Sequence, residues 1–130
     1  MSFTRRMVLI AAVGIGAVSS AAWAAGNAAF TSAAFEAAQK AGEPILVEVT
    51  APWCPTCKAQ APILGALKAQ DRFKALKTFT VDFDTQKDVL KSFNVQMQST
   101  LIVFKGGKEV GRSTGDTKQD SIEALLTKAL

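Results

Sequence analysis

Helical and strand-forming patterns alternate along most of this chain, and that order restricts the folds it can adopt. Apolar, β-branched runs at 45–50 and 78–84 predict strands, and apolar residues at helical spacing predict helices around them. Two further strands, 101–105 and 109–113, meet at Gly106 and Gly107 in a hairpin pattern. The predicted elements in order are helix 31–42, strand 45–50, helix 55–68, strand 78–84, helix 87–93, strands 101–105 and 109–113, and a closing helix capped near Thr117.

This order predicts an α/β domain built around one mixed sheet. Parallel strands need a long crossover connection, and the predicted helices supply it between the first strands. The hairpin adds an antiparallel edge. We therefore expect a central mixed sheet of about four strands flanked by helices, with a C-terminal β-hairpin and helix.

The first two dozen residues have a different character from the rest. Arg5 and Arg6 precede an apolar run at 8–22, and Ala22-Trp23-Ala24 offers an A-x-A cleavage site. This layout is typical of a secretory signal peptide, and an uncleaved membrane anchor is the alternative. The arginine pair also resembles a twin-arginine export signal, although an ordinary secretory signal fits equally well.

We therefore expect residues 1–24 to be a signal peptide and residues 25–130 to form the domain, in the periplasm or otherwise exported. The chain would contact the membrane only through the signal peptide, before cleavage. Residues 1–24 hold two of the 15 basic residues and none of the 11 acidic ones, so the rest of the chain carries a formal net charge of +2. No basic run is interleaved with aromatic residues, which argues against a nucleic-acid partner.

The absence of histidine from the whole sequence narrows the possible chemistry. Without histidine, Cys-His and Ser-His nucleophilic catalysis, HExxH zinc sites and His-ligated haem are excluded. The two cysteines, Cys54 and Cys57, are then the most reactive candidates.

A structural disulfide does not explain the spacing of these two cysteines. Closing a loop of about four residues stabilises a protein by roughly 2 kcal/mol, against about 4.7 kcal/mol for a loop of 100 residues. A reactive pair explains the spacing better. Pro55 suits the first position of a helix, which places the sulfur of Cys54 at a helix N-terminus, where a thiolate is favoured. Cys57, one turn further on, can resolve a mixed disulfide.

The segment Trp53-Cys-Pro-Thr-Cys-Lys58, with Pro62 five residues after Cys57, resembles the active-site motif of the thioredoxin family. The strand before it, the helix after it, the Gly-Gly hairpin and the final helix fit the same family, so the resemblance covers nearly all of residues 30–130. It implies thiol–disulfide exchange with protein thiols and disulfides, in which Cys54 attacks and Cys57 resolves. It implies no cofactor beyond the redox-active disulfide. The surrounding residues expected at the active site are Trp53, Pro55, Thr56, Lys58 and Pro62.

Glu48 interrupts the apolar strand 45–50, six residues before Cys54. An acidic side chain on a buried strand costs free energy unless it is partnered or protonated. The thioredoxin family usually carries an acid here, beneath the second cysteine. The resemblance therefore implies that Glu48 is a general base for Cys57, acting through water. The alternative is a glutamate that points to solvent from an edge strand.

The chain departs from the family at Ser99. Thioredoxin-like proteins place a cis-proline just before the strand that corresponds to 100–104, facing the cysteines, where it helps to bind the substrate backbone. A cis bond before a residue other than proline costs about 3–4 kcal/mol. We therefore predict that the Gln98–Ser99 bond is trans, or is held cis only by strong local contacts. The substrate loop, which we define as Gln98, Ser99 and Thr100, should be altered in either case.

Three functions are compatible with these patterns. The first is an exported thiol–disulfide oxidoreductase, with the reductase direction favoured, electrons supplied by a membrane thiol donor, and a disulfide oxidase or isomerase as the alternative. The second is a metal or iron–sulfur module in which a dimer binds the metal through Cys54 and Cys57 of both chains. Ser99 permits this function, because the proline that the family has at this position helps to keep metals away from the cysteines. The third is a binding or chaperone module with an idle cysteine pair.

Overall fold

The structure is a computed structural model, and it describes residues 27–130. The predicted signal peptide lies outside these described residues. Within them, no helix is both long enough and apolar enough to cross a bilayer.

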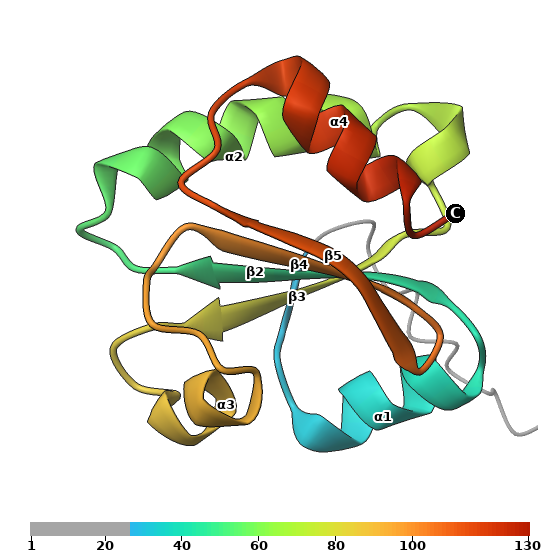
Figure 1. Ribbon diagram of the computed structural model, residues 1–130, viewed down its shortest axis with the longest axis horizontal. Coiled ribbons are helices and arrows are strands. Elements are labelled where there is room, and N and C mark those ends of the chain that lie inside the picture. The colour runs from blue at the N-terminus through green and yellow to red at the C-terminus, as the bar shows by residue number, and fades with distance from the viewer. Residues whose placement is uncertain (1–26) are drawn as a thin grey trace, which may run out of the picture.

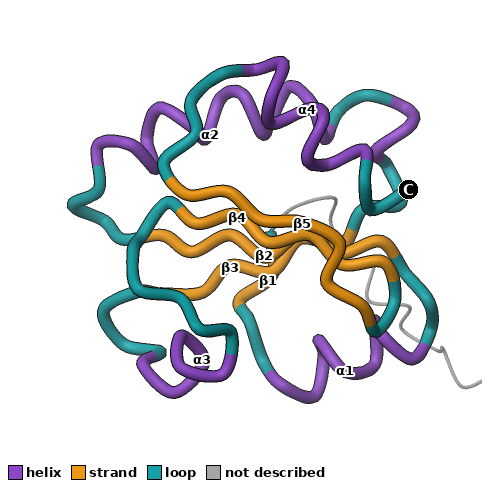
Figure 2. Tube along the Cα trace, viewed as in Figure 1, coloured by secondary structure: helices purple, strands orange, loops and turns teal. Residues whose placement is uncertain are grey.

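Five strands form one mixed sheet in the order β1-β3-β2-β4-β5 (Figure 2). β3 pairs in parallel with both β1 and β2, whereas β4 pairs antiparallel with both β2 and β5. The parallel core and antiparallel hairpin confirm the predicted class, with one strand more than expected. The added strand, β1, has two residues, too few to show a pattern in the sequence. The strands are β1 (Ala28–Ala29), β2 (Pro44–Thr50), β3 (Lys77–Asp82), β4 (Thr100–Lys105) and β5 (Lys108–Thr114).

Helices cover both faces of this sheet (Figure 1). α2 (Pro55–Lys68) and α4 (Gln119–Thr127) lie on one face, and α1 (Ser32–Lys40) and α3 (Lys87–Ser92) lie on the other. A short 3-10 helix, η1 (Asp71–Phe73), follows α2 and was not predicted.

The first turns of α1 and α4 are capped in different ways. The hydroxyl of Thr31 caps α1 by accepting the N–H of Ala34 at 3.2 Å. α4 begins near Thr117, as predicted. Its N-cap is Lys118, which makes no side-chain capping bond, and the carboxylate of Asp116 accepts the Lys118 N–H instead.

β2 is buried on both faces, which explains its nearly continuous apolar run. Val47 and Val49 pack into the core beneath α1 and α3. Leu46 packs into the second core, beneath α2 and α4. Because side chains alternate along a strand, Glu48 points toward the same face as Leu46. β2 ends just before the cysteines, so a central strand and the helix that follows it position the site.

Candidate active site

Cys54 and Cys57 form a disulfide at the N-terminus of α2, with their Cα atoms 5.3 Å apart. Cys54 is the N-cap of this helix, and its sulfur accepts the N–H of Cys57 at 3.1 Å. Pro55 occupies the first turn, as predicted. The free N–H groups and the dipole of the helix therefore face the sulfur of Cys54 and would stabilise a thiolate there after reduction.

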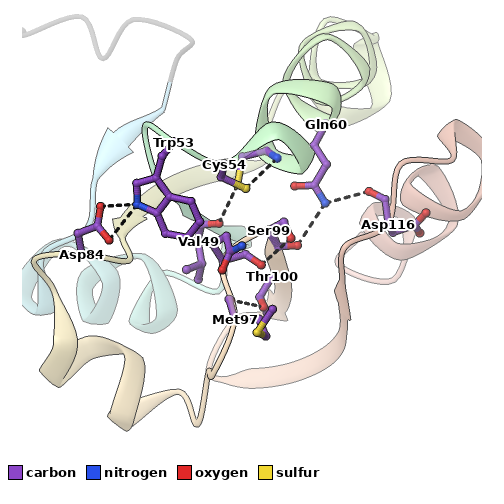
Figure 3. The surroundings of a disulfide bond; sticks show 11 residues. Val49, Trp53, Cys54, Gln60, Asp84, Met97, Ser99, Thr100 and Asp116 are labelled. Carbon is purple, nitrogen blue, oxygen red and sulfur yellow. Dashed lines mark hydrogen bonds between the residues drawn. A yellow bond between two sulfur atoms is a disulfide. The ribbon is translucent and has the colours of Figure 1, made fainter.

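Two large exposed side chains, Trp53 and Met97, belong to the segments beside the disulfide (Figure 3). The indole N–H of Trp53 donates to both carboxylate oxygens of Asp84, at 2.9 and 3.2 Å. Trp53 is 54% exposed, so this tryptophan does not belong to the core. Cys54 itself is 0% exposed in this disulfide form.

The other residues of the predicted active-site motif lie on the first two turns of α2. Pro55, Lys58 and Pro62 are exposed, and Thr56 is half-buried. The helix continues through Pro62 to its end at Lys68. Lys58 thus belongs to the solvated face of the helix.

Glu48 is buried and has two partners. Its carboxylate accepts a hydrogen bond from the side-chain amide of Asn27 at 2.5 Å and one from the Nζ of Lys68 at 3.2 Å. The ammonium of Lys68 also donates to the Oδ1 of Asn27 at 2.6 Å. Glu48 is 5% exposed on a central strand, which excludes the alternative of a solvent-facing edge residue. The general-base role of Glu48 toward Cys57 stays a prediction.

The Gln98–Ser99 bond is trans, as predicted, and Ser99 adopts the left-handed conformation with φ 60°. The Ser99 N–H donates to the Val49 carbonyl at 2.8 Å, and the Ser99 carbonyl accepts the Gly115 N–H at 3.0 Å. The Val49 carbonyl also lies 3.9 Å from the sulfur of Cys57. The substrate loop is therefore bonded to the strand that leads into the cysteine motif.

Gln60 is a site residue that the sequence interpretation missed. It is 2% exposed, and its side-chain amide donates to the Ser99 carbonyl at 3.2 Å and to the Asp116 carbonyl at 2.8 Å (Figure 3). A signal was present, because the buried residues of α2 recur at helical spacing and Gln60 is the polar member of that stripe. The buried stripe consists of Cys57, Gln60, Leu64 and Leu67.

The contacts of Asn27, Lys68 and Asp84 had no comparable signal in the sequence. Each partner lies 20 or more residues away along the chain. Local spacing carries no information about such pairs.

Among the residues that the structure describes, no group of three or more His, Cys, Asp or Glu side chains could hold a metal ion. The two sulfurs of one chain are joined in the disulfide.

Comparison with known proteins identifies the family. A sequence model described as Thioredoxin matches residues 27–128. The thioredoxin of Chlamydia muridarum is 38% identical over 84 residues, which are 65% of this chain and 80% of that protein. Thioredoxin Asp f 29 of Aspergillus fumigatus is 31% identical over 91 residues, which are 70% of this chain and 82% of that protein.

Solved structures share the same fold. Trxlp from Edwardsiella tarda EIB202 superposes with a TM-score of 0.74 at 46% identity, covering 75% of this chain and 95% of that one. Thioredoxin NaTrxh from Nicotiana alata gives a TM-score of 0.66 at 31% identity, covering 75% of this chain and 82% of that one. Thioredoxins exchange protein disulfides through their own active-site disulfide, without a further cofactor, and this chain carries such a disulfide at the N-terminus of α2. The chain therefore belongs to the thioredoxin family and is a thiol–disulfide oxidoreductase.

Proposed function

We propose that this oxidoreductase works outside the cytoplasm as a reductase that passes electrons from a dithiol donor at the membrane to protein disulfides. The observation that supports the reductase direction is the compact, uninterrupted domain. Between β3 and β4 the chain holds one helix, α3, of six residues, and no inserted helical domain. The N-terminal sequence pattern supports export.

The chemistry begins with the reduced protein. The thiolate of Cys54 attacks one sulfur of a partner's disulfide, forming a mixed disulfide and releasing the partner's other sulfur as a thiolate. The thiolate of Cys57 then attacks the sulfur of Cys54 and displaces the partner's second sulfur. Two electrons have passed to the partner, the Cys54–Cys57 bond has formed, and a donor dithiol must reduce it before the next cycle.

The geometry supports roles in this reaction for several neighbours of the cysteines. The helix N-terminus stabilises the attacking thiolate of Cys54. In the reduced protein the thiol of Cys57 can donate to the Val49 carbonyl, which lies 3.9 Å from its sulfur. The exposed Trp53 and Met97 offer apolar surface to an incoming polypeptide beside the disulfide.

The direction can be tested by measuring the reduction potential of the Cys54–Cys57 pair. The protein would be equilibrated in defined redox buffers and its free thiols alkylated and counted. A value of about −270 mV, where thioredoxin lies, is the expected result for a reductase. A value between about −180 and −120 mV would instead assign the protein to the isomerases or oxidases.

The same measurement distinguishes an oxidoreductase from the two other functions, a metal module and a binding module. The matched control is the variant with serine at both cysteine positions, which must give no thiol titration. A wild-type pair that does not titrate as a dithiol would refute the proposal. Metal analysis of protein purified under reducing conditions would then decide between a metal module and a binding module.

Export is tested separately, by expressing the full chain in a bacterium and separating the periplasmic fraction from the cytoplasm. We expect the protein in the periplasmic fraction, with its new N-terminus at Ala25 by mass spectrometry. An uncleaved chain in the cytoplasmic fraction would contradict the proposed location.

A further inference from the structure

We infer that Gln60 is a positioning residue for exchange with protein disulfides, because it holds the substrate loop at the Cys54–Cys57 pair. This inference deepens the proposed function and rests on it. It concerns a residue outside the cysteine motif, on the helix that the motif begins.

The side-chain amide nitrogen of Gln60 joins three distant parts of the chain. Its side-chain amide nitrogen has two hydrogens, and each has an acceptor: the Ser99 carbonyl at 3.2 Å and the Asp116 carbonyl at 2.8 Å. These acceptors lie 39 and 56 residues further along the chain. Because Gln60 and Ser99 are both almost completely buried, water cannot replace the bond between them if the amide is removed.

The substrate loop needs such a support because of its backbone conformation. Ser99 has φ 60°, a left-handed conformation that is unfavourable for any residue with a Cβ atom. It therefore persists only where surrounding contacts hold it. Two of these contacts join backbone groups, from the Ser99 N–H to Val49 and from the Gly115 N–H to the Ser99 carbonyl. Gln60 supplies a contact from a side chain, so its identity can change the stability of the loop.

The position of Gln60 connects the loop to the reacting sulfurs. Gln60 lies one helical turn after Cys57, on the same buried stripe of α2. The Val49 carbonyl, which accepts the Ser99 N–H, also lies 3.9 Å from the sulfur of Cys57. A bond from α2 to Ser99 therefore fixes the position of the substrate loop relative to the cysteines. A polypeptide substrate that lies along the loop depends on this position, whereas a small disulfide that contacts only the sulfurs does not.

The test compares two substrates in the Gln60→Met variant. Methionine matches the length and shape of glutamine but cannot donate to either carbonyl. The matched control is Leu64→Ala, a cavity on the same face of the same helix that removes no bond to the loop. The substrates are insulin, as a protein disulfide, and 5,5′-dithiobis(2-nitrobenzoic acid), as a small one. Initial rates over a range of substrate concentrations give KM and kcat for each.

For Gln60→Met we expect the KM for insulin to rise about fivefold to tenfold, with kcat and the rate with the small disulfide within about twofold of wild type. Leu64→Ala should leave the KM for insulin unchanged. Three results would overturn the inference. These are an unchanged KM for insulin in Gln60→Met, a fall in kcat/KM for the small disulfide as large as that for insulin, or the same rise in the KM for insulin in Leu64→Ala.

A second measurement separates failure of this inference from failure of the proposed function. If the wild-type protein does not reduce insulin at all, the reductase function is refuted, and the role of Gln60 is decided by hydrogen exchange instead. With each rate expressed relative to wild type, the Ser99 amide should exchange at least fivefold faster in Gln60→Met than in Leu64→Ala. Equal exchange in the two variants would refute the positioning role whatever the direction of the reaction.

Discussion

The ion pair between Glu48 and Lys68 allows a quantitative prediction of stability. The Nζ of Lys68 lies 3.2 Å from a carboxylate oxygen of Glu48, and the two side chains are 23% and 7% exposed. Removing one partner of a buried pair costs about 3–5 kcal/mol, because the other charge stays buried without compensation. Here Asn27 still donates to the carboxylate, and Lys68 is partly in contact with water. We therefore expect Lys68→Met to lower the free energy of unfolding by about 2 kcal/mol.

Urea unfolding of the oxidised protein measures this loss directly. The midpoint should fall with an unchanged m value, and Tm should fall by roughly 10 °C for a domain of this size. The matched control is Lys74→Met, which removes an exposed ion pair with Asp71 and should cost no more than about 0.5 kcal/mol. The double variant Glu48→Leu with Lys68→Met should recover most of the loss, since apolar residues often replace a buried pair without penalty. Equal costs for Lys68→Met and Lys74→Met would refute the reasoning.

Three further predictions concern the exchange reaction and one turn. Cys57→Ser should trap a mixed disulfide between Cys54 and a partner protein, visible as a dithiothreitol-sensitive band on a non-reducing gel; no band would contradict the assigned roles. Trp53→Ala should raise the KM for insulin several-fold while urea unfolding changes by less than about 1 kcal/mol, because the side chain is half exposed, and an unchanged KM would exclude it from docking. Gly106→Ala should lower the free energy of unfolding by about 1 kcal/mol, because φ is 59° in this turn, and a variant as stable as wild type in urea would show that the turn tolerates a Cβ atom.

The active-site cysteines show what local sequence can predict. Pro55 directly after Cys54 indicated a helix start, and the structure has Cys54 as the N-cap of α2. Apolar runs and their spacing located the main helices and strands within a few residues. These features depend on neighbours along the chain, whose relation is set by the periods of helix and strand. The trans bond at Ser99 followed from the cost of a cis peptide without proline.

The short strand β1 could not be predicted from local sequence. Two alanines have no strand pattern of their own, and they form a strand because they lie along the exposed edge of β3. The exposure of Trp53 was equally undecided by sequence. A tryptophan suits a core or a surface. Its bond to Asp84 depends on the fold, which brings the residues after β3 beside the cysteine motif.

The sequence by itself determined the chemistry of this protein, a pair of cysteines at the start of a helix in an α/β domain. The tertiary structure decided which groups support that pair. Gln60 meets Ser99 and Asp116, and Glu48 meets Lys68, across separations of 20 to 56 residues. Such contacts follow from the packing of α2 and the loops on the sheet, and no local period encodes them. A buried polar side chain in an apolar stripe indicates that a partner is needed, but only the fold shows which one is in reach.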